Sequence, residues 1–350
     1  MKRVIIGMSG GVDSSVAAAL LKEEGYEVIG VTLRLWDKDN QYEISKEAID
    51  AKKVCDRLNI EHYTLDFREE FKDKVIKKFI SEYFEGRTPN PCIECNKYLK
   101  FKYLLEKATQ MDCDYIATGH YAISEYDESI NRYLLRKSKA DKKDQTYVLY
   151  NLTQEQLKKV IFPLGKFDNK EEIRDVAIKI GLDVASKKDS QDICFIPNGN
   201  YKEFLSEYDN NNIKEGNIVD LNGNVLGKHT GIINYTIGQR KGLGLSMPNP
   251  TFVVNIDKEN NTVIVGQEKD LYTNELEAND LNWIMFDKLE GQMKVKAKTR
   301  YSAKLEDATI YMKDEDIVKV IFDNPQRAIT RGQAVVFYKD EYIIGGGTII

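Results

Sequence analysis

The first half of the chain alternates between short apolar runs and longer segments with a helical period. Buried β-strands are predicted by four apolar runs: Val4–Met8, Val28–Leu35, His62–Phe67 and Tyr115–Thr118. Amphipathic helices are predicted between and after them, at 14–24, 45–58, 68–85, 96–110 and Glu172–Ile180. Strands that alternate with helices are typical of α/β proteins. We therefore predict a doubly wound parallel sheet for this half of the chain.

Beyond residue 208 the pattern changes to short alternating runs that Gly and Asn residues separate. The polar run Asp209–Asn212 predicts a connector, and the turn-rich stretch after it predicts a small β-rich domain. Five further strands, at 292–299, 306–313, 317–322, 334–339 and 342–349, have the spacing of a compact β-barrel. We expect three domains, over 1–208, 209–270 and 271–350.

Composition limits the possible classes of protein. A chain of 350 residues with 42% hydrophobic residues can bury more than one core. No apolar run approaches the length of a membrane span, and Met1–Arg3 lead directly into the first strand without a signal peptide. Five cysteines in a long chain without a secretory signal are typical of thiol or metal chemistry in the cytoplasm.

The net charge of −5 argues against nucleic acid as a partner, but two basic clusters weaken that argument. The first cluster is Arg132, Arg136, Lys137, Lys139, Lys142 and Lys143. The second is Lys294, Lys296, Lys298 and Arg300, whose alternation places all four on one face of a strand. Either cluster could equally be an ordinary solvated face.

The loop Ser9–Ser15 has the composition of a phosphate-binding loop. It lies between a predicted strand and a predicted helix, where backbone N–H groups and the helix dipole bind anions. It contains neither the P-loop pattern nor the dinucleotide Gly-x-Gly-x-x-Gly pattern. Its acidic residue, Asp13, would repel phosphate unless a divalent cation lies between them, so we expect Mg²⁺ at Asp13.

Three cysteines form the second candidate constellation. Cys92 and Cys95 form a C-x-x-C pair behind two prolines, and Cys194 lies about 100 residues further on. We predict that Cys95 begins the helix at 96–110, where a helix N-terminus favours the thiolate.

The loop resembles the Ser-Gly-Gly-x-Asp-Ser motif of the PP-loop ATP pyrophosphatases, which split ATP between the α and β phosphates. With both cysteine segments and the stretch Gly238–Gly242 added, the whole chain resembles the tRNA-specific 2-thiouridylases of bacteria. That resemblance implies a PP-loop domain, a small β domain and a C-terminal β-barrel.

The resemblance also implies roles for individual residues. Cys95 matches the nucleophile and Cys194 the cysteine that carries persulfide sulfur, while Asn90, Pro91 and Cys92 match residues that flank the target uridine. Positions that hold ATP are matched by Gly7, Met8, Ser9, Gly10, Gly11, Val12, Asp13, Ser14, Leu33 and Gly119. Further tRNA contacts are matched by His120, Asp144, Gln145, Thr146, Tyr301, Ser302 and Gln333.

One departure from the family concerns Cys92, where better-known members carry an aspartate credited with acid/base work. Two alternatives follow. Either Cys95 and Cys194 carry out persulfide and disulfide chemistry beside an uninvolved Cys92, or all three ligate a [4Fe–4S] cluster with one iron open to hydrosulfide. The spacing favours the cluster, and zinc or a free dithiol also fits it.

The resemblance implies ATP-dependent 2-thiolation of the wobble uridine of tRNA through an adenylated base. The partners would be tRNA and a sulfur donor, either a protein (a persulfide relay or a desulfurase) or inorganic sulfide, without a membrane. Two other functions use part of the sequence. A PP-loop amide-forming ligase leaves the cysteines without a role, and a non-catalytic RNA-binding iron–sulfur protein leaves the loop without one.

Overall fold

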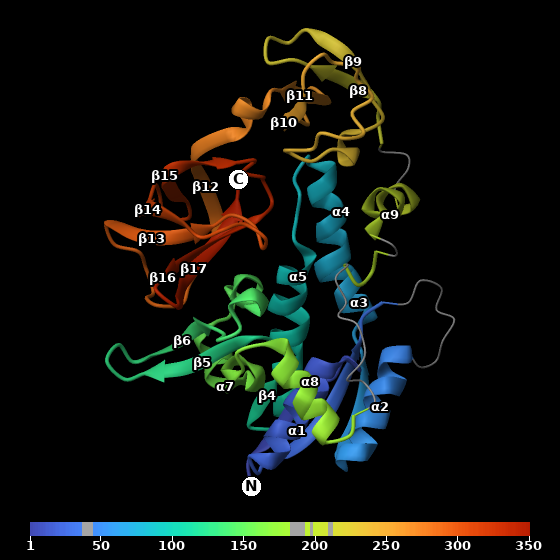
Figure 1. Ribbon diagram of the computed structural model, residues 1–350, viewed down its shortest axis with the longest axis vertical. Helices are drawn as coiled ribbons and strands as arrows, with labels where there is room; N and C mark the ends of the chain where they lie inside the picture. Colours follow the sequence, from blue (N-terminus) through green and yellow to red (C-terminus); the bar gives the residue numbers. More distant parts are fainter. Residues whose placement is uncertain (37–44, 183–192, 197–198, 209–212) are drawn as a thin grey trace.

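The computed structural model describes residues 1–36, 45–182, 193–196, 199–208 and 213–350 (Figure 1). The predicted connector Asp209–Asn212 lies outside these residues. None of the described helices is both long and apolar enough to cross a membrane.

A five-stranded parallel sheet forms the centre of the N-terminal domain. Its order is β3-β2-β1-β4-β7, with β1 in the middle. The strands are β1 (Arg3–Gly7), β2 (Glu27–Arg34), β3 (Glu61–Asp66), β4 (Tyr115–Ala117) and β7 (Val160–Ile161). The doubly wound parallel sheet predicted from the sequence is therefore confirmed, and the predicted strands match within two residues at each end.

Helices cover both faces of this sheet because side chains of a strand alternate between its faces. On one face, Val4 and Ile6 of β1 pack against α1 (Val12–Glu23), α2 (Lys46–Leu58) and α8 (Lys170–Lys179). On the other face, Ile5 packs with Phe101, Leu104 and Leu157. That second layer contains α5 (Pro91–Glu94), the π-helical segment η2 (Cys95–Tyr103), α6 (Leu104–Gln110) and α7 (Gln154–Lys159).

The helix predicted at 96–110 begins five residues earlier. Asn90 is its N-cap and accepts a hydrogen bond from the Cys92 N–H at 3.1 Å, and Pro91 is the first helical residue. The segments α5, η2 and α6 run on without a break from Pro91 to Gln110. An adjoining helical segment comprises α3 (Arg68–Phe71), the π-helical η1 (Lys72–Ile76) and α4 (Lys77–Phe84). Lys78 of α4 pairs with Glu94 of α5 at 2.7 Å.

Shorter elements complete the N-terminal domain and lead to the next. They are the 3-10 turns η3 (Asp141–Lys143), η4 (Thr146–Leu149) and η5 (Pro163–Lys166), followed by α9 (Tyr201–Tyr208). The central domain is a four-stranded sheet of order β10-β11-β8-β9 around Ile218, Val253 and Val263. Its elements are β8 (Gly216–Val219), β9 (Val225–His229), η9 (Ile232–Asn234), β10 (Phe252–Asp257), β11 (Thr262–Gly266) and η10 (Glu268–Leu271).

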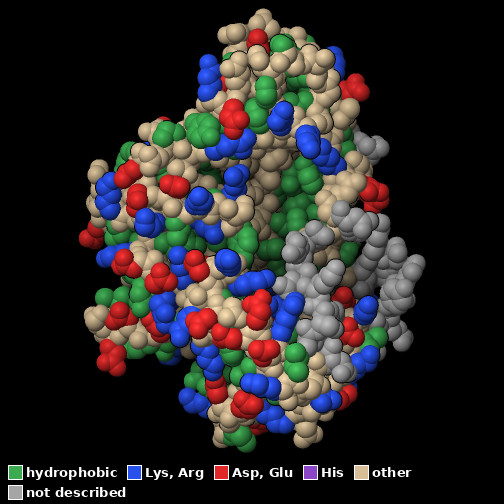
Figure 2. Space-filling model, viewed as in Figure 1, with side chains coloured by type: hydrophobic (Ala, Val, Ile, Leu, Met, Phe, Trp, Pro, Cys, Tyr) green, Lys and Arg blue, Asp and Glu red, His purple; other side chains and the backbone are tan. Residues whose placement is uncertain are grey.

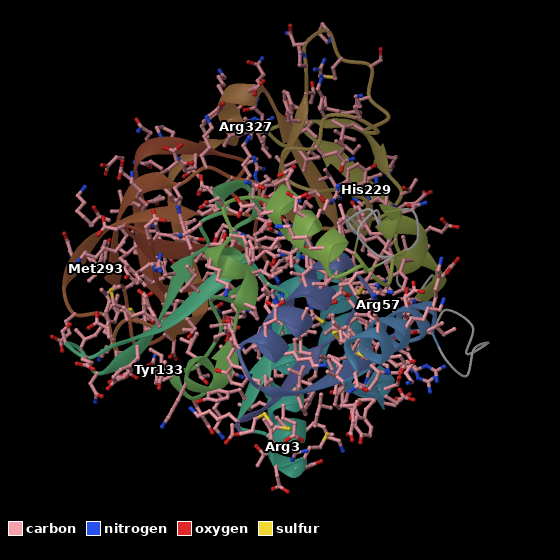
Figure 3. All side chains as sticks on the ribbon, turned by 60° about the horizontal axis from the view of Figure 1, so that its bottom comes forward. Arg3, Arg57, Tyr133, His229, Met293 and Arg327 are labelled. Atoms are coloured by element: carbon pink, nitrogen blue, oxygen red, sulfur yellow. The ribbon has the colours of Figure 1, made fainter. Side chains whose placement is uncertain are left out.

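Six antiparallel strands form the C-terminal barrel. Its order is β12-β15-β14-β13-β16-β17, and pairing of β12 with β17 closes it. The strands are β12 (Tyr272–Trp283), β13 (Gln292–Lys298), β14 (Glu306–Met312), β15 (Val318–Arg327), β16 (Ala334–Lys339) and β17 (Tyr342–Ile349). The predicted barrel is confirmed, although β12 was not among its predicted strands. Arg327 lies at the junction with the central domain (Figure 3), where it pairs with Glu268 at 3.1 Å.

A hairpin of the N-terminal domain extends the barrel sheet. Its strands β5 (Ala122–Asp127) and β6 (Arg132–Lys137) were not predicted, and Arg136 of β6 pairs with Tyr342 of β17. A second attachment lies at Thr88, whose N–H donates to Arg331 O at 2.8 Å and whose carbonyl accepts from Gln333 Nε2 at 2.6 Å. The barrel is therefore bonded to the N-terminal domain both before and after, in the sequence, the helix that carries Cys92 and Cys95.

Candidate nucleotide and thiol sites

The predicted phosphate loop follows β1 directly and leads into the first turn of α1. Gly7 ends β1, and Met8 fixes the chain by donating its N–H to Val31 O at 2.7 Å. Val12, Asp13 and Ser14 begin α1, and the Ser14 hydroxyl lies 3.2 Å from both the N–H and the hydroxyl of Ser9. The loop thus presents hydroxyl and backbone groups at a helix N-terminus, as an anion-binding loop requires.

Two glycines of the loop have clear structural reasons. Gly10 has φ +66°, and a Cβ there would lie 2.9 Å from both Glu47 O and Asp50 Cβ. Gly11 is the N-cap of α1 and supplies no capping side chain. The helix N-terminus therefore faces the loop without a side-chain acceptor from its own cap.

The other predicted ATP residues lie at the same edge of the sheet. Ile6 of β1 pairs with Ala117 of β4, so Gly119 follows β4 beside the loop. A Cβ at Gly119 would lie 2.8 Å from Ser14 N, which shows that the two backbones are in contact. Leu33 lies two residues beyond Val31, the partner of Gly7 in β2. The structure thus brings all ten predicted ATP residues to the carboxyl ends of β1, β2 and β4, where open α/β sheets bind ligands.

Asp13 has a protein cation as its partner. Its Oδ2 lies 2.7 Å from Lys170 Nζ, and its Oδ1 accepts a hydrogen bond from the Tyr121 hydroxyl at 2.7 Å. Lys170 is the first residue of α8, behind the N-cap Asn169, and is 7% exposed. Sequence reasoning missed both Lys170 and Tyr121. The Asn169 cap was a local signal for the start of α8, but no local signal connects Lys170 to a loop 157 residues away.

The two cysteines of the C-x-x-C pair have different environments. Cys92 is in the first turn of its helix and is exposed. Cys95 was predicted to begin the helix, but it lies inside it and is buried among Phe79, Leu99 and Phe195. Burial raises the pKa of the Cys95 thiol from 9.0 to about 12, so the predicted thiolate at a helix N-terminus is wrong.

Cys194 lies at the surface beside this apolar cluster. Its neighbours Phe195 and Ile196 pack in the cluster that contains Cys95, while 183–192 and 197–198 lie outside the described residues. Desolvation raises the pKa of the Cys194 thiol, and Cys92 raises it further. Both Cys194 and Cys92 act in the same direction on Cys95, so the three thiols are near one another. Within the described part of the chain, however, no three His, Cys, Asp or Glu side chains are arranged to hold a metal ion.

Lys100 and His120 lie between the loop and the thiols. The positive charge of Lys100 lowers the pKa of Cys95, of Cys194 and of His120, which places its ammonium near all three. The His120 ring contacts Phe101, and its Nδ1 lies 2.8 Å from Thr118 Oγ1. Burial holds the pKa of His120 well below 6.5, so the imidazole is neutral at pH 7. Sequence reasoning did not single out Lys100.

The segment predicted to contact tRNA, Asp144–Thr146, is bonded to the hairpin and to Tyr121. Asp144 accepts from Ser138 N–H at 3.1 Å and from the Thr146 hydroxyl at 2.6 Å. Gln145 accepts from the N–H of Tyr121 at 3.0 Å. Burial raises the pKa of Asp144.

The barrel residues that were predicted to contact tRNA lie close to Asp144 and to Asn90. The Tyr301 hydroxyl donates to Asp144 O at 3.3 Å, and the Cys92 thiol is near enough to raise the pKa of Tyr301. Ser302 is the next residue, and Gln333 bonds to Thr88, two residues before Asn90. The barrel thus reaches the residues around Cys92. His229, in contrast, bonds to Asn261 O and Gly231 N–H inside the central domain (Figure 3).

The two predicted basic faces differ from expectation. In the first, Arg132 pairs with Asp287 at 2.7 Å and Arg136 with Glu125 at 3.1 Å. In the second, Arg300 lies beyond the end of β13, so the four cations do not share one strand face. Lys294 and Lys296 pair with Asp323 of β15 and Asp307 of β14. The pairing residues come from other segments of the chain, which the local alternation cannot reveal.

The surface is hollowed where the three domains meet. Figure 2 shows a hollow with an apolar floor between the barrel, the central domain and the N-terminal domain, and Lys and Arg side chains along its rim. In Figure 1, α4 and α5 lie at this position.

Comparison with known proteins identifies the family. Three family models match consecutive parts of the chain: the tRNA methyl transferase HUP domain (residues 2–198), the tRNA methyl transferase PRC-barrel domain (residues 202–267) and the aminomethyltransferase beta-barrel domain (residues 273–349). A solved structure of a 4-thiouridine synthetase–RNA complex with bound ATP covers 59% of this chain and 50% of its own, at 18% identity. Its TM-score of 0.39 is too low for it to support an argument.

Full-length relatives are much more similar. The tRNA-specific 2-thiouridylase MnmA of Acetivibrio thermocellus is 54% identical, over 99% of this chain and 99% of its own. The proteins of the same name from Clostridium perfringens and Clostridioides difficile are 55% and 53% identical, each over 99% of this chain and 98% of its own. The chain therefore belongs to the MnmA family of tRNA-specific 2-thiouridylases.

Proposed function

We propose that this chain catalyses the ATP-dependent 2-thiolation of the wobble uridine of tRNA and releases AMP and pyrophosphate. The observation that carries this proposal is identity of 53–55% to relatives named tRNA-specific 2-thiouridylase MnmA, along 99% of the chain. The structure supports it, because the phosphate loop and the three cysteines lie on elements that contact each other through Gly119, His120 and Lys100.

The first step activates the base. The phosphates of ATP lie against Ser9–Ser14, where the N-terminus of α1 and the serine hydroxyls stabilise negative charge. The target uridine leaves its stack to reach the site. Its C2 oxygen attacks the α-phosphate, which gives an O-adenylated base and pyrophosphate. After adenylation, the group that leaves C2 is AMP. The unmodified carbonyl oxygen would be a very poor leaving group.

The loop offers Mg²⁺ one carboxylate ligand, but a lysine already pairs with that carboxylate in this structure. Asp13 is the carboxylate of the loop, and protein-bound Mg²⁺ is typically held by one or two carboxylates together with substrate phosphates. Asp13 would hold the ion, which would neutralise charge on the phosphates. Both Asp13 oxygens already have partners in this structure, Lys170 and Tyr121. Lys170 therefore supplies the compensating cation of the loop when Mg²⁺ is absent.

The second step transfers sulfur. We propose that the terminal sulfur of a Cys194 persulfide attacks C2 and expels AMP, so that the base is joined to Cys194 through a disulfide. The Cys95 thiolate then attacks the Cys194 sulfur and releases 2-thiouridine, leaving a Cys95–Cys194 disulfide that a thiol reductant restores. A persulfide-carrying protein or desulfurase supplies the sulfur as sulfane sulfur. Inorganic sulfide, the alternative source, would instead attack C2 directly and expel AMP, without a Cys194 persulfide.

The three thiols are near one another, but their described arrangement does not support a [4Fe–4S] cluster. Cys92, Cys95 and Cys194 do not form a metal-holding group in the described part of the chain, and the Cys95 sulfur is buried among apolar side chains. We therefore derive no step through a cluster. The cluster predicted from the spacing stays a prediction that iron analysis tests.

We also propose that the chain divides into the domains 1–208, 209–270 and 271–350, which three separate cores support.

Purified protein should release AMP and pyrophosphate only when tRNA is present, and 2-thiouridine should appear in the digested tRNA.

Replacing Asp13 with Ala removes the partner of Lys170 from the loop, so we expect thiolation to fall by about 100-fold or more. Asp56→Ala, which removes an exposed carboxylate paired with Lys52, is the matched control. Normal thiolation by the Asp13→Ala variant would contradict the use of the loop proposed here.

Lys170→Met should weaken ATP binding by about tenfold or more, because an unneutralised Asp13 then faces the phosphates. Lys170→Arg keeps the charge and should bind ATP to within about threefold. The double variant Asp13→Asn/Lys170→Met removes both charges and should bind ATP better than Lys170→Met alone. Calorimetric titration of a non-hydrolysable ATP analogue provides the measurement. Equal affinities of Lys170→Met and the wild type contradict the role of this ion pair.

Individual cysteine variants separate the two sulfur mechanisms. The persulfide route predicts that Cys194→Ala abolishes thiolation and that Cys92→Ala keeps at least about a tenth of it. It also predicts that protein purified without oxygen contains no stoichiometric iron or sulfide. About four irons per chain, lost together with activity in Cys92→Ala, would establish the cluster instead.

Thiol alkylation tests the burial of Cys95. With a pKa of about 12 in place of 9.0, about one Cys95 thiol in 10,000 is ionised at pH 8, against about one in ten for an unperturbed thiol. Iodoacetamide should therefore label Cys95 at least about 100-fold more slowly than exposed Cys92, and its rate should rise about tenfold for each pH unit. Unfolded protein, in which both sites are exposed, is the control. Equal rates in the folded protein rule out the burial described here.

A further inference from the structure

Tyr121 lies between the phosphate loop and the part of the N-terminal domain that joins the barrel. It follows the end of β4 and comes directly before β5, the first strand of the hairpin that pairs with the barrel. Its side chain is 2% exposed and packs in the cluster that contains Val12 and Ala17 of α1. Burial leaves the ring little freedom to move, so the fold sets the position of its hydroxyl.

The backbone of Tyr121 is bonded in both directions to one residue, Gln145. The Tyr121 N–H donates to Gln145 Oε1 at 3.0 Å, and the Tyr121 carbonyl accepts from the Gln145 N–H at 3.0 Å. Gln145 follows Asp144, whose carbonyl accepts from the Tyr301 hydroxyl of the barrel at 3.3 Å. The pair of hydrogen bonds to Gln145 fixes the Tyr121 backbone, and with it the direction of the side chain toward the loop.

The Tyr121 side chain contacts both members of the ion pair in the loop. Its hydroxyl donates to Asp13 Oδ1 at 2.7 Å, and Lys170 Nζ lies 2.7 Å from Asp13 Oδ2. Lys170 Nζ also lies 5.9 Å from the centre of the Tyr121 ring, which is within the range of about 6 Å for a cation–π contact. Lys170 begins α8, which packs beside α1 (Figure 1). Both Asp13 oxygens are therefore bonded to side chains from outside their own helix.

An aspartate in the first turn of a helix has other partners within reach. The first N–H groups of a helix have no acceptor inside the helix, and an aspartate side chain can accept from backbone N–H groups close to it in sequence. Asp13 is the second residue of α1, and the N-cap Gly11 provides no side-chain acceptor. In the described part of the chain, neither Asp13 oxygen accepts from a backbone N–H. A carboxylate that turned onto these N–H groups would occupy the place of a phosphate.

We infer that Tyr121 is a positioning residue of the phosphate loop, and that its hydroxyl holds the Asp13 carboxylate on Lys170 and away from the N-terminus of α1. The N–H groups of the first turn then remain available to a phosphate of ATP. This inference rests on the proposed function, because it requires the phosphates of ATP to bind at this loop. Without the hydroxyl, Asp13 competes with the phosphates for the same N–H groups.

Tyr121→Phe tests the hydroxyl alone, because phenylalanine keeps the buried ring and its contact with Lys170. Tyr115→Phe is the matched control. Tyr115 begins β4, at the opposite end of that strand from the loop, and its hydroxyl bonds to Lys2 Nζ at 2.9 Å. Asp13→Ala provides a second background, because it removes the carboxylate on which the hydroxyl acts. Thermal unfolding of each variant confirms that it is folded.

The measurement is calorimetric titration of the full-length variants with α,β-methylene ATP, in a chelator that removes Mg²⁺. Tyr121→Phe should bind the analogue about tenfold more weakly than the wild type, because Asp13 loses a hydrogen bond that holds it away from the phosphates. Tyr115→Phe should bind it to within about twofold of the wild type. In the Asp13→Ala background, adding Tyr121→Phe should change the affinity by less than about twofold.

Two results would overturn the role of Tyr121. One is equal affinity of Tyr121→Phe and the wild type. The other is a loss that persists in the Asp13→Ala background, since the hydroxyl would then act through packing and not through Asp13. A wild type that binds the analogue but forms no 2-thiouridine overturns the proposed function and leaves the role of Tyr121 in the loop intact. A wild type that does not bind the analogue overturns both.

Discussion

The close packing of Gly119 against the first turn of α1 determines where the two halves of the chemistry meet. There is no room for a side chain at Gly119, because a Cβ would lie 2.8 Å from Ser14 N and 2.9 Å from the carbonyl carbon of Asp13. The next residue, His120, contacts Phe101 on the helix that carries Cys92 and Cys95. A shift of that backbone by even one methyl radius would move the phosphate loop relative to the thiols, and positioning errors of about 1 Å can cost a large part of a catalysed rate.

An aspartate in a phosphate loop needs a cation, and the fold provides one. The position of Asp13 in a phosphate loop predicts a compensating cation, and a bound metal ion was the one expected from the sequence. The structure adds Lys170 at 2.7 Å, from a helix on the same face of the sheet as α1. Because this ion pair exists before ATP binds, the partly buried Asp13 carboxylate has a compensating charge. A partly buried carboxylate without one would cost several kcal/mol. Lys170 is also well placed to neutralise phosphate charge if Mg²⁺ takes over Asp13.

Periodicity along the chain predicted four of the five parallel strands and most barrel strands because those segments bury a regular apolar face, but the two-residue β7 was too short to give a pattern. It missed β5 and β6, which carry charges along a hairpin at a sheet edge, and β12, whose run Glu275–Asp280 alternates weakly. The helix start was predictable in principle, since Asn90-Pro91 is an N-cap followed by a proline at the first helical position. The C-x-x-C pair led instead to the prediction that the helix begins at Cys95. Partners such as Lys170 for Asp13, or Asp307 for Lys296, come from other elements, so local pattern could not indicate them.

The burial of Cys95 limits how sulfur can be transferred. Burial raises the pKa of the Cys95 thiol to about 12, so this thiol is a poor nucleophile at neutral pH, and the proposed resolving step requires that Cys95 first become exposed. That protection is useful, because an early Cys95–Cys194 disulfide would discharge the persulfide before a base is activated. The barrel is bonded to the N-terminal domain at Thr88 and at β6, and Tyr301 of the barrel lies near Cys92. In the proposed mechanism, tRNA docked beside Cys92 would contact the helix that also carries Cys95, so RNA binding would precede exposure of the buried thiol.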